Sequence, residues 1–239
     1  MRVVLRPLTL GLLFLAAGCL TLPGGLRNVS VGPAADARLR KQQAILAVQR
    51  KGGIITTQPG DPNLSVVGAD LHGIRVTPAL LDALGPWNLA RTLNLYHTGI
   101  NDAGLQCFRG LPNVVELNLS ANSITDAGLA CVQTLAELRW LDLNETAVTD
   151  AGLRLVGTLP RLQRLSLYRT HVTDAGLAHL RGLRYLERLA LGGPAITDHG
   201  LAYLKGLRNL RELDLFASRV TDAGIQDLKK SLPRLTVVR

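Results

Sequence analysis

The chain has 239 residues, of which 47% are hydrophobic and 19% charged, and its formal net charge is +9. The length is sufficient for a large buried core, and the apolar fraction excludes a disordered protein. Aromatic residues make up only 4% of the chain, so the core must consist mainly of leucine, valine, isoleucine and alanine. Three cysteines are too few for a disulfide framework, which excludes a small scaffold held together by disulfides.

The N-terminal segment has the pattern of a signal peptide. Arg2 and Arg6 precede an uncharged run over residues 8–17 that is too short to span a bilayer. The sequence at residues 15–19, Leu-Ala-Ala-Gly-Cys, resembles the lipobox of bacterial lipoproteins. This resemblance implies an exported protein that is anchored to a membrane of the cell envelope through lipidated Cys19. An ordinary cleavage site after small residues is the alternative, and it implies a periplasmic or secreted protein.

Residues 1–18 are therefore expected to be a signal peptide. Residues 19–33 contain glycine and proline but no periodic apolar face, which predicts a flexible tether. Residues 36–51 predict a helix whose arginine and lysine side chains lie away from an apolar face, and residues 54–57 predict a short strand. That apolar face consists of Ala44, Ile45, Ala47 and Val48. We interpret residues 34–63 as a helix–strand cap for the region that follows.

Residues 64–239 repeat with a period of 24 residues. Aliphatic side chains recur at this spacing without a slip, at Val76, Ile100, Ile124, Val148, Val172, Ile196 and Val220. Columns of Thr, Asp and Gly run parallel to them, and one unit reads Leu-x-x-Leu-x-Leu-x-x-Thr-x-Val-Thr-Asp-Ala-Gly-Leu-x-x-Leu-x-x-Leu. The period and the Leu-x-Leu pattern resemble those of leucine-rich repeat proteins. The Thr-Asp-Ala-Gly-Leu segment resembles bacterial members related to the ribonuclease-inhibitor-like and cysteine-containing subclasses.

The resemblance implies an α/β fold, a right-handed solenoid with parallel strands on its concave face and helices on its convex face. Within Leu-x-Leu the leucines point into the coil and the intervening residue points outward, because side chains alternate along a strand. Thr or Asp before Ala-Gly-Leu is expected to cap the following helix by accepting hydrogen bonds from its first free N–H groups. Stacking of the repeats is required, since no single repeat can bury its leucines alone.

The Asp column admits a second interpretation, a ladder of carboxylates that share calcium ions, but helix capping explains the same residues without a metal. The five histidines share no metal-ligand spacing, and we expect neither a metal nor a cofactor. His171, Asp174 and Ser166 occupy unrelated phases of the repeat, which argues against a catalytic triad. Cys107 and Cys131 lie on neighbouring helices and are expected to be free, half-buried thiols rather than a disulfide.

The positive charge does not indicate nucleic-acid binding. Arginines on the predicted helices alternate with acidic residues and form no continuous basic run. A solvated convex surface accounts for them, and an exported protein rarely meets nucleic acid.

The outward strand positions are the expected partner-binding surface, because leucine-rich repeat proteins usually bind on that face. Tyrosine, tryptophan and arginine, which dominate interface hot spots, are frequent there. The candidate residues are Tyr96, Glu116, Trp140, Asp142, Arg164, Tyr168, Arg188, Gly192, Glu212, Asp214 and Phe216. The sequence favours a monomeric, non-catalytic module that binds a protein or peptide. An envelope glycan bound by the aromatic residues is the alternative, and a hydrolase would need a site that no motif indicates.

One repeat departs from the pattern at Gly192, which lies between the equivalent positions Tyr168 and Phe216. Strand spacing places those two side chains about 10 Å apart across a bare floor that Ala190 extends. This predicts an open slot for a planar group between the two rings. The arginines at positions 164, 169 and 188 are expected at its edge.

Overall fold

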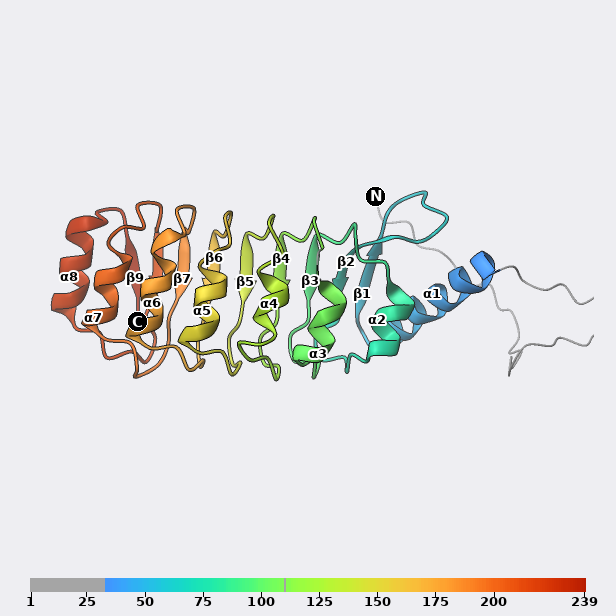
Figure 1. Ribbon diagram of the computed structural model, residues 1–239, viewed down its shortest axis with the longest axis horizontal. Coiled ribbons are helices and arrows are strands. Elements are labelled where there is room, and N and C mark those ends of the chain that lie inside the picture. The colour runs from blue at the N-terminus through green and yellow to red at the C-terminus, as the bar shows by residue number, and fades with distance from the viewer. Residues whose placement is uncertain (1–32, 110) are drawn as a thin grey trace, which may run out of the picture.

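The computed structural model describes residues 33–109 and 111–239. The strands form one continuous sheet in chain order, and the helices pack along one face of it (Figure 1). Cys19, the predicted signal peptide and residues 19–32 of the predicted tether lie outside the described residues.

The sheet has nine strands: β1 (Ile54–Thr57), β2 (Val66–Asp70), β3 (Thr92–Asn94), β4 (Glu116–Asn118), β5 (Trp140–Asp142), β6 (Arg164–Ser166), β7 (Arg188–Ala190), β8 (Glu212–Asp214) and β9 (Thr236–Val238). β1 is antiparallel to β2, whereas every later strand is parallel to the one before it. From β3 on, each residue pairs with the residue 24 positions later, as Leu117 does with Leu141. The solenoid predicted from the repeat is therefore confirmed.

The helices are α1 (Pro33–Arg50), α2 (Pro78–Leu84), α3 (Asp102–Leu105), α4 (Leu129–Val132), α5 (Asp150–Val156), α6 (Asp174–Leu177), α7 (Asp198–Leu201) and α8 (Asp222–Ser231). Turns of 3₁₀ helix follow α3, α6 and α7, at Gln106–Phe108, Ala178–Gly182 and Ala202–Leu204. Most of these helices are only one or two turns long. Their leucines pack on the sheet, which stabilises helices too short to persist alone.

The core is a set of stacked leucine columns between the sheet and the helices. Leu141 and Leu143 are fully buried, while Asp142 between them is only partly buried. The alternation predicted from Leu-x-Leu is thus confirmed, and the outward positions form the exposed face of the sheet.

The Asp column joins neighbouring repeats, so the prediction that these residues cap helices was wrong for Asp and right for Thr. Thr149 caps α5, its Oγ1 accepting a hydrogen bond from the Ala151 N–H. Asp126 of the preceding repeat accepts hydrogen bonds from both the N–H and the hydroxyl of Thr149, at 2.8 and 2.6 Å. The same bridge recurs in the pairs Asp102–Thr125, Asp150–Thr173, Asp174–Thr197 and Asp198–Thr221.

This bridge also explains the Gly column. A Cβ atom on Gly152 would overlap the Asp126 carboxylate, and the same overlap recurs between Gly176 and Asp150. The carboxylate of one repeat therefore occupies the space that the glycine of the next repeat leaves free. The Asp, Thr and Gly columns act together to connect adjacent repeats.

The predicted N-terminal helix and strand are present as α1 and β1, but the helix begins at Pro33 and its packing differs from the prediction. Ala44, Ile45 and Val48 of α1 are buried, whereas Ala47 is exposed. Lys41 lies on the buried side of the helix and is only 5% exposed, although the sequence pattern placed the basic side chains away from that face.

Both cysteines of the repeats are free, as expected, but neither is half-buried. Cys107 is exposed and Cys131 is buried. Burial raises the pKa of the Cys131 thiol. Among the described residues, no helix is both long and apolar enough to cross a membrane.

Candidate functional site

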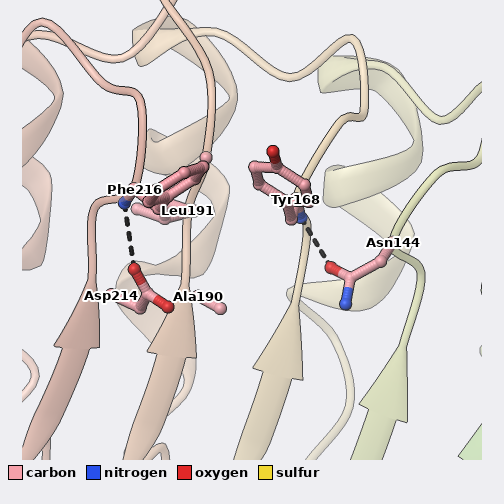
Figure 2. Close-up of a pocket in the computed structure, with 7 residues that line it drawn as sticks. Asn144, Tyr168, Ala190, Leu191, Asp214 and Phe216 are labelled. Atoms are coloured by element: carbon pink, nitrogen blue, oxygen red, sulfur yellow. Dashed lines mark hydrogen bonds between the residues drawn. The ribbon is translucent and has the colours of Figure 1, made fainter. Parts of the chain in front are cut away.

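A hollow of about 320 Å³ lies on the exposed face of the sheet, beyond the carboxyl ends of β6, β7 and β8 (Figure 2). We call it the ring hollow. The residues that line it are Asn144, Tyr168, Ala190, Leu191, Gly192, Asp214 and Phe216. The end of β7 and the residues just after it form the floor, because Ala190 and Gly192 have almost no side chain to extend above the backbone.

The two aromatic rings of the ring hollow are in contact. The ring centroids of Tyr168 and Phe216 are 5.8 Å apart with an interplanar angle of 59°. A third ring stacked between them would need a separation of about 7–8 Å, so the predicted open slot is closed. Strand spacing concerns only the backbones, whereas the two rings meet beside Gly192, where a Cβ atom would overlap the Tyr168 ring.

Two polar side chains below the rings hold the backbone that carries them. The Asn144 side-chain oxygen accepts a hydrogen bond of 2.7 Å from the Tyr168 N–H, and Asp214 Oδ1 accepts one of 2.9 Å from the Phe216 N–H (Figure 2). Within the described part of the chain, Asp214 Oδ2 and the Asn144 amide nitrogen make no hydrogen bond. Both groups are therefore available to a ligand next to the rings.

A second hollow of about 270 Å³ adjoins the first and shares Ala190 and Asp214 with it. Its other lining residues include Trp140, Arg164, Ser166, Arg188 and Glu212. We call it the charged hollow, and the two together the β7 groove.

The charges of the second hollow are only partly balanced. Arg188 Nε lies 3.3 Å from Glu212 Oε2, whereas Arg164 forms no ion pair with any described residue. Arg164 is thus the free cation of the β7 groove. It can bind a carboxylate through its planar guanidinium group, with Trp140 beside it as an apolar contact.

The structure brings most of the predicted binding residues together in this groove, namely Trp140, Arg164, Tyr168, Arg188, Gly192, Glu212, Asp214 and Phe216. Tyr96 and Glu116 line neither hollow, and the Tyr96 ring contacts His97 instead. Arg169 was expected at the edge of the slot but pairs with Glu145 and lies 5.2 Å from the Tyr168 ring centre. Asn144 belongs to the groove and was absent from the predicted set, although it shares the outward column of Tyr168 and Phe216.

Asp142, the last residue of β5, also lies outside the groove, two residues before Asn144. Burial raises the pKa of its carboxyl group, although a hydrogen bond from the Asn144 N–H at 2.9 Å opposes that effect. Its carboxylate therefore contributes to the local structure of the strand end.

The described residues contain no group of three or more His, Cys, Asp or Glu side chains that could hold a metal ion. Of the residues considered for a triad, Asp174 has its carboxylate hydrogen-bonded to Thr197. The arrangement on the exposed sheet face suits non-covalent recognition.

Comparison with known proteins agrees with this architecture. Two models described as leucine-rich repeats match residues 89–148 and 206–229. No curated protein sequence matches the chain significantly.

Two solved structures illustrate the likeness of fold. Internalin C2 of Listeria monocytogenes is 23% identical, with a TM-score of 0.62 over 86% of this chain and 85% of the internalin chain. A leucine-rich repeat protein of Leptospira interrogans is 21% identical, with a TM-score of 0.51 over 74% of this chain, and the match spans half of the Leptospira chain. The sequence period, the parallel sheet and these matches together show that the chain has a leucine-rich repeat fold.

Proposed function

We propose that this protein is a non-catalytic binding module that holds a protein or peptide partner in the β7 groove. The observation that carries the proposal is the groove itself, a concave region that joins the exposed Phe216 ring and the half-buried Tyr168 ring to an unpaired arginine over a floor of small residues. Aromatic and arginine side chains around a well-defined hollow are the usual centres of binding energy in protein interfaces. Leucine-rich repeat domains generally mediate interactions between proteins.

The two hollows favour different parts of the partner. An aliphatic or basic side chain fits the ring hollow, with its methylene groups against Tyr168 and Phe216 and its polar end near Asp214 Oδ2. An acidic side chain fits the charged hollow beside Arg164. A peptide that carries both groups can occupy the β7 groove without leaving either charge unpaired.

Alanine substitution on the full-length protein tests this site. Phe216→Ala and Arg164→Ala should each weaken capture of the partner from envelope extracts at least 10-fold, because each removes a main contact of one hollow. Tyr185→Ala is the matched control, since Tyr185 is 59% exposed and lies outside the β7 groove. Equal capture by all three variants would contradict the proposal, and competition by free sugars would favour a glycan ligand.

Gly192→Ala gives a second test within the same groove. The added Cβ atom displaces the Tyr168 ring and should weaken binding, whereas Gly206→Ala places a Cβ atom in open space and should not. Unchanged binding by Gly192→Ala would remove the ring hollow from the site.

We further propose that the protein is exported and anchored to the cell envelope through a lipidated Cys19. The support comes from the sequence alone, from the lipobox-like residues 15–19 and the basic residues before them. Cys19→Ser should abolish lipid labelling and release the protein from the membrane fraction. A wild-type protein that is wholly soluble, with an unmodified N-terminus, would contradict anchoring.

A further inference from the structure

A cavity of about 740 Å³ lies between α1, α2 and residues 63–65, at the N-terminal end of the solenoid and apart from the β7 groove. Alanines of both helices and Pro86 line much of it. Its polar lining side chains are predominantly basic or neutral: Arg38, Arg40, Lys41, Asn63, Ser65 and Asn88, with Asp82 as the one carboxylate of the lining.

Lys41 is the most unusual of these side chains. It is 5% exposed, and its ammonium group makes no hydrogen bond or ion pair within 4 Å among the described residues. No side-chain nitrogen or oxygen of the described residues is both fully buried and without a hydrogen-bond partner, so the Lys41 ammonium keeps some contact with solvent. Lys41 is one of the residues that line the cavity. A lysine buried on a helix face ordinarily needs a paired anion to offset its lost hydration.

The nearby carboxylates do not supply that anion by direct contact. Asp61 acts on Lys41 only through its charge, and its oxygens accept hydrogen bonds from the Asn63 and Ser65 N–H groups. Arg40 is occupied by Asp36, at 2.8 Å, while Arg38 has no ion pair in the described chain. Among the described residues, the cavity lining therefore has two cations without an ion pair, Arg38 and Lys41, and one carboxylate, Asp82, while Asp61 lies outside the lining.

We propose that this cavity binds an organic phosphate, with its phosphate group held between Lys41 and Arg38. A phosphate offers three oxygens, so one group can accept from the compact lysine ammonium and from the planar arginine fork together. The cavity is much larger than a phosphate ion, and the alanines and Pro86 provide room for an attached carbon chain. The ligand is accordingly a phosphate ester, either a small soluble one or the headgroup of a phospholipid.

Binding of glycerol phosphate to the full-length protein, measured by calorimetry, tests the site. Lys41→Met should weaken binding at least 10-fold, because methionine keeps most of the length of the side chain and removes its charge. Methionine is also tolerated at a buried helix position, so the unfolding temperature should not fall. Lys51→Met is the control, since Lys51 is exposed just beyond the end of α1 and does not line the cavity.

A vesicle arm separates the two sources of phosphate. Cys19→Ser protein, which cannot be lipidated at that position, is sedimented with vesicles of phosphatidylglycerol in phosphatidylcholine and with phosphatidylcholine alone. Sedimentation with phosphatidylglycerol that is lost on Lys41→Met identifies a lipid headgroup, and binding of glycerol phosphate alone identifies a soluble ester. The proposal is overturned if neither probe binds, or if Lys41→Met binds as tightly as the wild type.

Discussion

Two equivalent turns of the solenoid, around Asn122 and around Pro194, show how this protein forms a groove on a regular scaffold. Asn122 is buried, and its side chain accepts from the Thr98 and Ile100 N–H groups and donates to the carbonyls of Leu95, Leu119 and Ser120. The Asn122 side chain thus connects its own repeat to the preceding one by hydrogen bonds. The corresponding residue three repeats later, Pro194, is exposed and has no side-chain donor.

In the two turns between Asn122 and Pro194, the residue at this position makes fewer side-chain hydrogen bonds than Asn122 does. Thr146 and Thr170 each donate a hydroxyl hydrogen bond to the leucine carbonyl three residues earlier. At Gly193 the backbone adopts a φ of +121°, and its N–H reaches the Phe216 carbonyl at 3.3 Å. The groove lies at the turn in which no side chain of this position makes such a hydrogen bond. The residues that stabilise the solenoid are therefore different from those that shape its surface.

The largest expected effect is at Asn122. Asn122→Ala leaves several buried N–H and carbonyl groups without partners and should lower the free energy of unfolding by about 4 kcal/mol. Pro194→Ala should change it by no more than about 1 kcal/mol, since that turn is exposed and has no comparable bonds. Urea denaturation followed by circular dichroism measures both. Similar losses would show that the two turns contribute equally to stability.

Substitutions of the core leucines below these two turns should destabilise the protein equally. Leu119 and Leu191 follow β4 and β7 at equivalent positions and are 0% and 1% exposed. Substitution of either by alanine should cost about 3 kcal/mol through the cavity it leaves. A much smaller loss for Leu191→Ala would mean that the β7 groove extends into the core and is not a surface feature.

The bridges on the helix side should give the next largest effect. Asp174 joins the repeat of β6 to that of β7 by accepting hydrogen bonds from Thr197, and Asp174→Ala should cost about 1–2 kcal/mol. Asp222 occupies the same column but is 91% exposed, and its partner is Arg239. Asp222→Ala should therefore stay within about 0.5 kcal/mol. Equal losses would indicate that general charge, and not the bridge, accounts for the Asp column.

The sequence sufficed to predict the strand register and the inward leucines, because a strict period of 24 allows one way to stack the repeats. The role of the Asp column was not predictable in the same way. A carboxylate next to a helix start can cap its own helix or reach the next repeat, and both options leave the same periodic pattern. The structure distinguishes the two roles, because it places the Asp126 carboxylate in the space that Gly152 of the next repeat leaves free.

The binding surface shows a similar limit. The outward columns contain the residues that line the groove, but also Tyr96, Glu116 and Asp142, which do not. The small residues Ala190 and Gly192 indicated where the face is hollow. The closing of Tyr168 on Phe216 depends on side-chain rotation, which strand spacing does not determine. The burial of Lys41 depends on how α1 packs against α2, and a basic residue within a charged helix gives no signal of it.

The smallest expected effect is a pH dependence of opposite sign on the two faces of the solenoid. Burial raises the pKa of Asp142 on the strand side, so the contribution of this residue to stability is complete below its unfolded value and is lost as the pH rises through its folded value. Hydrogen bonds from Thr221 lower the pKa of Asp198 on the helix side, so its contribution is present above the unfolded value and is lost as the pH falls.

Substitution of each aspartate by asparagine separates the two effects. Relative to the wild type, Asp142→Asn should gain stability between pH 3 and pH 7, because the amide cannot acquire the poorly solvated charge. Asp198→Asn should lose stability over the same interval, because the wild-type carboxylate strengthens its bonds to Thr221 as it ionises. Urea denaturation at a series of pH values measures the two differences in the free energy of unfolding. Trends of the same sign would contradict the conclusion that the charged carboxylate is disfavoured at Asp142 on the strand face and favoured at Asp198 on the helix face.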